Sequence, residues 1–184
     1  MNRLASPAQL RASFLRWALF AVPLVLLLGY LSGVVSGSSA ESEWFRHLRK
    51  PDTFPPPATF GIVWTVLYAL MGLALAMVCA AWGARRRGLA ITLFVLQLMV
   101  NLAWSPVFFA AHQIRLALYV IAALDVLVLL TIVLFWNVRR AAALLLLPYI
   151  AWIGFATLLT WQFLQLNPGA DGADVTSAVQ RFEL

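Results

Sequence analysis

The sequence predicts an all-α integral membrane protein, a bundle of five transmembrane helices. Three observations predict this fold. First, 63% of the 184 residues are hydrophobic and only 11% are charged, whereas about a quarter of the residues of a soluble domain are charged. Second, the charged residues cluster and leave long apolar stretches between them. Third, each stretch has the roughly 20 residues that a helix needs to cross a hydrocarbon core. A soluble enzyme, a nucleic-acid-binding domain and a disordered chain are excluded.

The charge clusters also delimit the domain organisation. A single transmembrane domain is expected over residues 16–167. A polar, poorly ordered N-terminal tail is expected over residues 1–15, and a polar C-terminal tail over residues 168–184. The spans within the domain are expected at residues 17–35, 61–82, 88–111, 116–136 and 141–166.

The first apolar run admits two interpretations. A basic segment, an apolar run and the small residues 36–40 together resemble a signal peptide with its cleavage region. The run is longer than the usual hydrophobic region of a signal peptide, however, and Gly29, Gly33 and Gly37 form a doubled G-x-x-x-G pattern. Because that spacing suits close packing between transmembrane helices, a retained first helix is the favoured interpretation.

The longest connection, residues 37–60, follows the first span and contains four of the nine prolines. The run from Pro55 to Pro57 fixes φ and removes backbone donors, which makes the chain extended and stiff. A short interfacial helix is expected just before it, over residues 43–48. The other connections are short, so consecutive helices should be antiparallel neighbours.

The distribution of charge predicts the orientation in the membrane. The N-terminus and the connections after the second and fourth spans share one side, which carries eight arginines and no acid. Because basic residues mark the cytoplasmic side, the N-terminus should be cytoplasmic and the C-terminus outside. Trp17, Trp82 and Trp136 would then lie at the cytoplasmic headgroups. The absence of an alternating β pattern favours the cytoplasmic membrane, and the excess of arginine over lysine suggests a bacterial source.

Polar and aromatic side chains within the spans are the candidate functional residues. Gln97 and Asn101 should point into the bundle, because an unpaired amide in hydrocarbon costs several kcal/mol. Either they bind a ligand or they are hydrogen-bonding groups between helices, and the two interpretations are equally supported. Depth along the helices places Asn101 and four aromatic residues between the membrane midplane and the outer face, beneath the proline-rich loop: Trp64, Tyr68, Trp104 and Trp152. Tyr149 lies three residues before Trp152 on the fifth span. Such stripes are more often core packing, but an aromatic cavity under a lid is also the general form of a hydrophobic-ligand site.

Asp125 is the one acidic or basic residue inside an expected span. An intramembrane acid is by default a functional hypothesis, such as a proton relay. No basic partner is visible at a comparable depth, so the alternatives are a protonated, hydrogen-bonded acid and a water-exposed one.

Catalytic and metal-binding residues are not identified in the sequence. Cys79, the single cysteine, lies within the second span and rules out an intrachain disulfide. His47 and His112 are isolated in loops and do not form a metal site. No cofactor is required by anything in the sequence.

Three ordered motifs resemble those of the TspO/MBR family, the tryptophan-rich sensory proteins related to the translocator protein, or peripheral benzodiazepine receptor. The first loop and second span contain W-F-x-x-L-x-K-P from Trp44, then Pro55-Pro56, Phe60, Trp64, Leu67-Tyr68 and Met71-Gly72. The third span contains Q-L-x-x-N-x-x-W-S-P-x-F-F from Gln97, and the fifth contains P-Y-x-x-W from Pro148, with Phe155-Ala156 and Leu166-Asn167. The resemblance covers about residues 17–167.

The resemblance implies a five-helix bundle, usually a homodimer, with a ligand cavity closed by the first loop. Family ligands are tetrapyrroles such as protoporphyrin IX and haem, sterols, and isoquinoline or benzodiazepine compounds. By position the ligand-binding residues would be Trp64, Tyr68, Asn101, Trp104, Tyr149, Trp152 and Ala156. The lid would consist of Trp44, Lys50, Pro51, Phe54, Pro55 and Pro56.

The chain also departs from the family pattern. Thr53 stands where many members have a loop tryptophan, which puts a porphyrin-stacking contact in doubt, although Phe54 is adjacent. Thr160 stands where asparagine is frequent, and no vertebrate-type cholesterol motif follows the fifth span.

Four classes of function remain open. The favoured one is a sensory or binding protein for tetrapyrroles and related hydrophobic ligands. The others are a transporter of porphyrins or lipids, a light-dependent porphyrin-degrading enzyme, and a structural partner of another membrane protein. The expected partners are a hydrophobic small molecule, the bilayer and a second copy of the chain, and nucleic acid is excluded.

Overall fold

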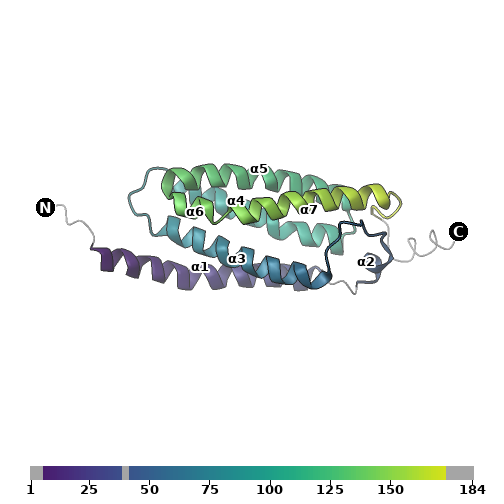
Figure 1. The fold of residues 1–184 in the computed structure, drawn as a ribbon, viewed down its shortest axis with the longest axis horizontal. Helices are drawn as coiled ribbons and strands as arrows, with labels where there is room; N and C mark the ends of the chain where they lie inside the picture. The colour runs from purple at the N-terminus through teal and green to yellow at the C-terminus, as the bar shows by residue number, and fades with distance from the viewer. Residues whose placement is uncertain (1–5, 39–41, 173–184) are drawn as a thin grey trace.

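The computed structural model describes residues 6–38 and 42–172, and these ranges form an elongated helical bundle (Figure 1). The described part of the chain contains helices and no strand. Its elements are α1 (Pro7–Val35), α2 (Glu43–His47), α3 (Pro57–Cys79), α4 (Arg87–Ser105), the π-helix η1 (Pro106–Ala110), α5 (Ile114–Val138), α6 (Arg140–Leu144) and α7 (Leu147–Leu166).

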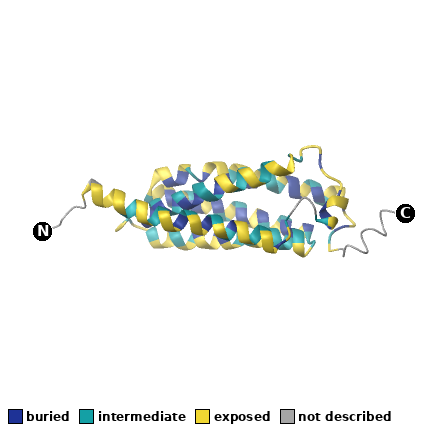
Figure 2. Cartoon of the chain, turned by 90° about the horizontal axis from the view of Figure 1, so that it is seen from below, coloured by how far each residue is buried: buried dark blue, intermediate teal, exposed yellow. Residues whose placement is uncertain are grey.

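Five helical segments of the described chain are long and apolar enough to cross a membrane, which confirms the predicted fold class. The third span consists of α4 continued by η1, and the fifth consists of α6 and α7 in series. Large apolar side chains cover the outside of the bundle: Leu19 is 77% exposed and Val35 is 79% exposed. Figure 2 shows exposed residues along the outer faces of the helices and buried ones between them. An apolar exterior of this extent is expected where the surroundings are lipid.

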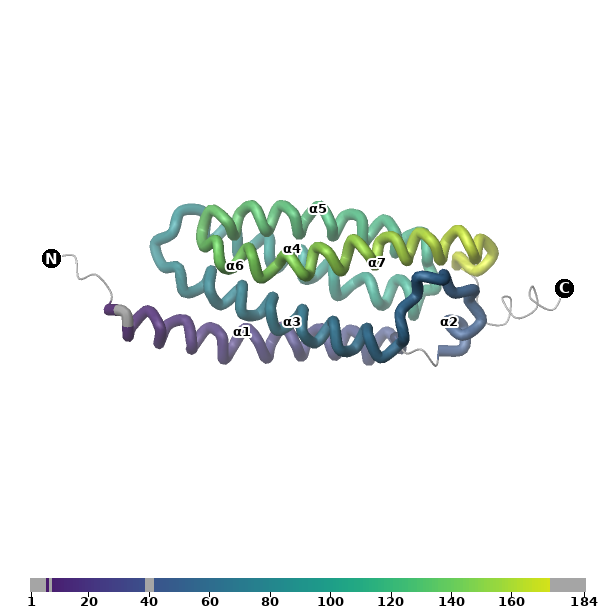
Figure 3. Tube along the Cα trace, viewed as in Figure 1, coloured from purple at the N-terminus to yellow at the C-terminus, as the bar shows by residue number. Residues whose placement is uncertain are grey.

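The helices form two groups. Helix α1 packs mainly on α3, whereas α4 packs on α5 and α5 packs on α7. Contact between α3 and α7 is slight. Figure 3 shows the long helices of both groups running along the length of the bundle, with α2 at one end. This division leaves space between the two groups at the end that carries α2.

Close contact between α1 and α3 depends on glycines. The aromatic ring of Tyr68 occupies the space that a Cβ atom on Gly29 would need. Gly72 of α3 in turn lies against the backbone of Val22 in α1. Of the three glycines of the motif, Gly29 is therefore the one that acts in packing between helices, and the first apolar run packs on α3 as helix α1.

The expected N-terminal tail is wrong in its described part, because α1 begins at Pro7 rather than near residue 17. Ser6 caps the helix: its Oγ accepts from the backbone N–H of Gln9, and the Gln9 side chain accepts from the backbone N–H of Ser6. Pro7 at the first helical position completes the start signal. Residues 1–5 lie outside the described residues.

The C-terminal segment is likewise bound to the bundle as far as it is described. The Asp171 carboxylate accepts a hydrogen bond of 3.0 Å from the backbone N–H of Arg115, at the start of α5. The backbone N–H of Gly172 donates to the carbonyl of His112. Residues 168–172 are therefore not a free tail, and the rest of the tail expected over 168–184 lies outside the described residues.

The end of the third span is a π-helix because of Pro106. Proline has no N–H to donate to the carbonyl four residues earlier, which belongs to Leu102. That carbonyl accepts a hydrogen bond from the Ser32 hydroxyl of α1 at 2.7 Å instead. The N–H of Ala111 then bonds the carbonyl of Pro106, five residues back. The wider turn changes the direction in which the aromatic residues that follow Pro106 point.

The fifth span is interrupted at Leu145 and Leu146, between α6 and α7. Pro148, which lies in the first turn of α7, again explains the break, since it cannot donate to the carbonyl of Leu144. The short helix expected over residues 43–48 is present as α2. Its Trp44 and Phe45 are 2% and 4% exposed, so α2 packs into the end of the bundle instead of lying on its surface.

Candidate ligand-binding site

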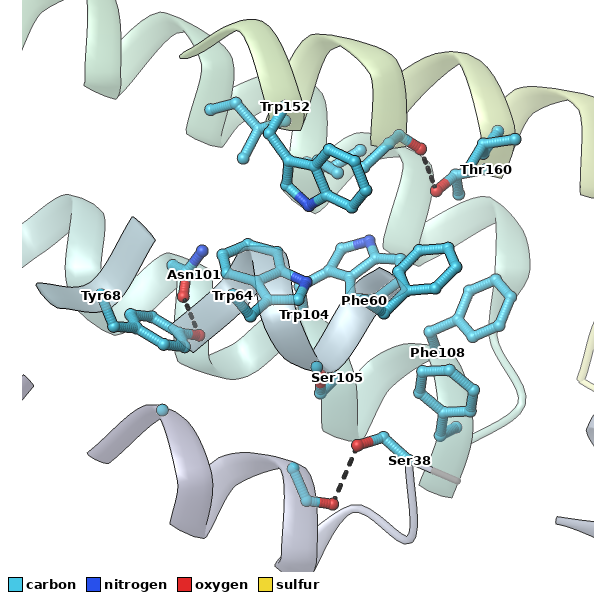
Figure 4. A pocket seen from close by; sticks show the side chains of 18 of the residues that line it. Ser38, Phe60, Trp64, Tyr68, Asn101, Trp104, Ser105, Phe108, Trp152 and Thr160 are labelled. Atoms are coloured by element: carbon cyan, nitrogen blue, oxygen red, sulfur yellow. Dashed lines mark hydrogen bonds between the residues drawn. The ribbon is translucent and has the colours of Figure 1, made fainter. Parts of the chain in front are cut away.

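A cavity of about 720 Å³ lies between the two helix groups, at the α2 end of the bundle. Residues of α1, α2, α3, α4, η1, α5 and α7 line it, together with the segment after α1 and the loop before α3. Figure 4 shows aromatic residues facing one another across it. Its volume is within the range of about 300–1,000 Å³ that is typical of small-molecule sites.

Six of the seven predicted ligand-binding residues line this cavity: Trp64, Tyr68, Asn101, Trp104, Trp152 and Ala156. The seventh, Tyr149, does not. It is 0% exposed and lies behind Asn101. Its spacing from Trp152 and the family resemblance pointed to Tyr149, but its side chain belongs to the packed core.

A chain of hydrogen bonds connects the cavity to the interior. The Tyr68 hydroxyl donates to Asn101 Oδ1 at 2.8 Å, and Asn101 Nδ2 donates to the Tyr149 hydroxyl at 3.0 Å. The Tyr149 hydroxyl in turn donates to Gln97 Oε1 at 3.0 Å. These four side chains come from α3, α4 and α7, so the chain joins three helices. Gln97 is a hydrogen-bonding group between helices, whereas Asn101 has that role and also faces the cavity.

Aromatic rings form the walls around the cavity. Trp104 stacks on Phe108 with ring centroids 5.1 Å apart, and Phe54 stacks on Phe60 at 5.2 Å. Phe60 also meets Trp152 edge to face at 5.7 Å. The π-helix brings Phe108 to this wall, because α-helical geometry after Pro106 would direct it elsewhere.

The described lining of the cavity is uncharged, and two of its polar atoms are indole donors without a partner. None of the described residues that line it is charged. The indole Nε1 atoms of Trp104 and Trp152 are buried and have no hydrogen-bond partner among the described residues. Trp152 projects from α7 with its indole nitrogen toward the cavity (Figure 4). A buried donor without a partner is costly, so a bound molecule with an acceptor at this position would gain affinity.

The predicted lid residues divide into two sets. Phe54 lines the cavity. Trp44 does not; it stacks on His112 with ring centroids 4.5 Å apart. The Lys50 ammonium donates to the carbonyl of Phe45 at 3.3 Å and lies over the Phe45 ring. Pro51, Pro55 and Pro56 shape the loop without lining the cavity, and Pro56 is extended, with φ −53° and ψ 138°.

Two contacts hold this loop to α7. The Asn167 side chain accepts from the backbone N–H of Arg49 at 2.8 Å and donates to the Arg49 carbonyl at 3.0 Å. The Thr53 hydroxyl donates to Gln162 Oε1 at 2.7 Å. Thr53 therefore anchors the loop, and the adjacent Phe54 provides the aromatic ring at the cavity.

Sequence reasoning missed several lining residues. Thr160 is buried, with its hydroxyl bonded to the carbonyl of Ala156. Ser105 lies between the predicted Trp104 and the π-helix. Helix α1 contributes both glycines, such as Gly29, and neighbouring residues, such as Tyr30. Only the glycine motif signalled that α1 takes part, and it indicated packing alone. The missed aromatic residues are Tyr30, Phe45, Phe60, Phe108, Phe109 and Phe163.

Comparison with known proteins gives a consistent result. The TspO/MBR family model matches residues 21–166. The chain is 37% identical over 148 residues to Tryptophan-rich protein TspO of Chlorobaculum tepidum, covering 80% of this chain and 93% of that protein. It is 32% identical to Protein CrtK of Rhodobacter capsulatus over 75% of this chain and 87% of that one. It is 34% identical to the human Translocator protein, over 70% and 78% of the two chains. The match extends over all five spans, and the chain belongs to the TspO/MBR family of multi-pass membrane proteins.

Proposed function

We propose that this protein is a membrane receptor that binds a flat hydrophobic ligand, most favourably a tetrapyrrole such as protoporphyrin IX or haem. The observation that carries the proposal is an uncharged cavity with aromatic walls, in which two tryptophans, Trp104 and Trp152, have indole donors without a partner among the described residues. Sterol-like and benzodiazepine-like compounds share the apolar character that this cavity requires. They are the second class of ligand to test.

The aromatic walls favour a planar ligand. Trp64 and Trp152 come from α3 and α7 and lie on facing sides of the cavity (Figure 4). Stacked aromatic contacts contribute about 0.5–1.5 kcal/mol each beyond the buried area. A macrocycle inserted between the two helix groups would contact several such rings at once.

The donors favour a ligand that carries acceptors. Trp104 and Trp152 each offer one indole N–H, and an indole nitrogen cannot accept. Carbonyl or carboxyl oxygens at the edge of a macrocycle supply the missing acceptors. Because no charged residue lines the cavity among those described, ionised carboxylates would lie at its mouth.

Transport is the alternative that the relatives favour, since the human relative bears the name Translocator protein. A flux assay in proteoliposomes separates transport from binding, because a receptor equilibrates its ligand without moving it across the bilayer. Porphyrin breakdown is tested in the same samples by the loss of porphyrin absorbance under light. We further propose that the protein acts as a homodimer in a bacterial cytoplasmic membrane, with its N-terminus in the cytoplasm.

The test of ligand class uses purified protein in detergent, titrated with protoporphyrin IX and followed by porphyrin absorbance and thermal stability. Trp152→Phe keeps an aromatic ring and removes the indole donor. We expect it to raise the Kd about three- to tenfold, as expected for the loss of one buried hydrogen bond. Trp161→Phe is the matched control, since Trp161 lies on the same helix, is 48% exposed and does not line the cavity.

A second ligand isolates the contribution of the donors. Etioporphyrin has the same macrocycle but only alkyl substituents, so its binding should not change in Trp152→Phe. Equal losses for both porphyrins would mean that Trp152 acts through packing alone. Absence of saturable binding of either porphyrin by the wild-type protein would rule out the tetrapyrrole proposal.

A further inference from the structure

Asp125 is an acid in the middle of a transmembrane helix. Helix α5 runs from Ile114 to Val138, which places Asp125 roughly 16 Å from one end and 19 Å from the other at 1.5 Å per residue. The side chain is partly exposed at the junction of α5 with α7. It does not line the cavity, and the function proposed above does not use it.

Thr157 of α7 is the hydrogen-bonding partner of this acid. The distance from Thr157 Oγ1 to Asp125 Oδ2 is 2.8 Å, and that from Thr157 Oγ1 to the carbonyl oxygen of Ile153 is 2.9 Å. The other carboxyl oxygen, Asp125 Oδ1, is buried and has no partner among the described residues.

The count of hydrogens determines which group donates. Thr157 has a single hydroxyl hydrogen, but both neighbours of its oxygen are acceptors if Asp125 is ionised. One of the two short contacts would then lack a hydrogen. If Asp125 carries a proton, it donates to Thr157 Oγ1, and Thr157 donates to the Ile153 carbonyl. Both contacts are then hydrogen bonds, and they form one directed chain from α5 to α7.

The membrane environment favours the same state. An ionised carboxylate in hydrocarbon without a counter-ion costs several kcal/mol. In the neutral acid, the unpartnered Oδ1 atom is only a carbonyl oxygen, which is cheaper to bury. Exposed neighbours of Asp125 on α5, such as Ala122 and Val126, are apolar and offer no compensating donor.

Among the residues that the structure describes, no cation is positioned to neutralise Asp125. On the described elements that pack against α5, the ionisable groups are Arg87 of α4, Arg140 of α6 and Tyr149 of α7. Both arginines lie at helix ends, and the Tyr149 hydroxyl is occupied by Gln97 and Asn101. The remaining ionisable groups of α5 itself are Arg115, which lies at the start of the helix, and the exposed Tyr119.

The chain of hydrogen bonds lies directly behind the cavity wall. Leu124 precedes Asp125 and lines the cavity. On α7, Ile153 and Ala156 also line it, and the Ile153 carbonyl is the final acceptor of the chain. The bonds from Asp125 to Ile153 therefore join the two helices that form this part of the wall.

We propose that Asp125 is a proton-binding site whose bound proton holds α5 to α7 behind the cavity, so that loss of the proton loosens this wall. Binding of a cavity ligand is then linked to binding of a proton. This linkage rests on the proposed function, whereas the proton site itself does not.

The first experiment labels the acid chemically. Dicyclohexylcarbodiimide is a hydrophobic reagent that reacts with protonated carboxyl groups, and peptide mass spectrometry locates the adduct. We expect labelling of Asp125 from the lipid side at neutral pH, decreasing as the pH is raised. Labelling that does not fall with rising pH contradicts a titrating proton site.

The second experiment compares melting temperatures as a function of pH. In Asp125→Asn, the carboxamide N–H donates to Thr157 as the protonated acid does, and it cannot be lost. We expect the variant and the wild type to have the same melting temperature at acidic pH, and the variant to have the higher melting temperature at alkaline pH. Parallel profiles for the two proteins overturn the proposal, whatever the labelling shows.

Thr157 variants supply an independent test, and they suffice if Asp125→Asn does not fold. Thr157→Val removes the acceptor for the acid proton, whereas Thr157→Ser retains a hydroxyl in the same place. We expect Thr157→Val to lower the melting temperature at acidic pH. Carbodiimide labelling of Asp125 should also be lost at a lower pH than in the wild type. Thr157→Ser should restore both the melting temperature and the labelling. If valine and serine behave alike, the hydroxyl does not hold the proton.

The linkage is measured with protoporphyrin IX at each pH in wild type and Asp125→Asn. Comparison of the two proteins at the same pH removes the effect of the ligand's own titration. We expect the two proteins to bind the porphyrin with equal affinity at acidic pH, and the wild type to bind it more weakly than Asp125→Asn at alkaline pH. Equal affinities throughout overturn the linkage and leave the proton site standing, whereas no porphyrin binding at all contradicts the proposed function only.

Discussion

Asn101 illustrates how a single polar residue in an apolar bundle combines a structural and a ligand-facing position. Its amide accepts from Tyr68 and donates to Tyr149, so it joins α4 to α3 and α7. It is 6% exposed, and it lines the cavity. The two interpretations that the sequence left equally supported are therefore not exclusive, and a variant must separate stability from affinity.

Asn101→Leu should destabilise the protein by about 1–2 kcal/mol, because the Tyr68 hydroxyl loses its acceptor and the buried Tyr149 hydroxyl loses a donor. Tyr68→Phe removes one of the same two bonds and should cost about half as much. Thermal unfolding of both variants in detergent measures the effect. If Asn101→Leu weakens porphyrin binding much more than Tyr68→Phe does, the amide also contacts the ligand; equal losses assign it to the bundle alone.

At the scale of elements, prolines and glycines determine where helices deviate and where they touch. Pro106 produces the π-helix that presents Phe108 to the cavity, and Pro148 interrupts the fifth span. Gly29 permits the ring of Tyr68 to lie against α1. These effects act through backbone geometry, and each therefore positions several side chains at once.

Gly29→Ala should destabilise the contact between α1 and α3, because a Cβ at this position overlaps the Tyr68 ring. Overpacking of this kind costs about 1–3 kcal/mol. Gly154→Ala is the control: Gly154 is also a helical glycine, but an added Cβ there meets nothing within 4 Å. We expect a lower melting temperature for the first variant and an unchanged or higher one for the second. A stable Gly29→Ala protein would show that α1 shifts freely on α3.

The loop that precedes α3 should need its buried contact with Asn167, at the end of α7, to keep a ligand in the cavity. Asn167→Ala removes both hydrogen bonds to the Arg49 backbone. We expect porphyrin dissociation to accelerate roughly tenfold, the effect of about 1.4 kcal/mol, while the helices stay folded. Stopped-flow displacement measures the rate. Gln162→Ala removes only the exposed bond to Thr53 and should change the rate little; equal rates in both variants would mean that the loop does not retain the ligand.

At the scale of the whole molecule, the ends of the bundle differ in charge. One end carries Arg85, Arg86 and Arg139 in the short connections between spans, and Arg140 at the first residue of α6. Arginines there lie over exposed tryptophans: Arg87 is 4.4 Å from the Trp82 ring and Arg140 is 5.6 Å from the Trp136 ring. The cavity and α2 lie at the opposite end. If the arginine-rich end is cytoplasmic, the cavity lies nearer the outer surface.

Cysteine labelling in intact cells tests this orientation. Asp52→Cys and Arg85→Cys place thiols in exposed positions at opposite ends of the bundle, and the native Cys79 is buried. A membrane-impermeant maleimide should label Asp52→Cys directly and Arg85→Cys only after permeabilisation. The reverse pattern would invert the topology, and labelling of both would indicate that the chain inserts in two orientations.

The sequence by itself determined the fold class, the number of spans, the longest connection and a minority of the residues that line the cavity. Hydropathy and helical periodicity are local properties, and the bilayer imposes the same length on every span. Trp64, Tyr68 and Asn101 could therefore be assigned to one level of the membrane before any packing was known. The start of α1 was also encoded locally, in the pairing of Ser6 with Gln9, although the polar composition of residues 1–15 obscured it.

Only the tertiary structure decided which face of each helix meets which neighbour. Tyr149 and Trp152 lie three residues apart on α7, yet one is enclosed in the core and the other lines the cavity. The π-helix that brings Phe108 to the wall depends on Ser32 of α1, which satisfies the carbonyl that Pro106 leaves free. The state of Asp125 likewise depends on Thr157, a residue of another helix. In each case the deciding contact joins residues far apart in the sequence, so no local pattern could reveal it.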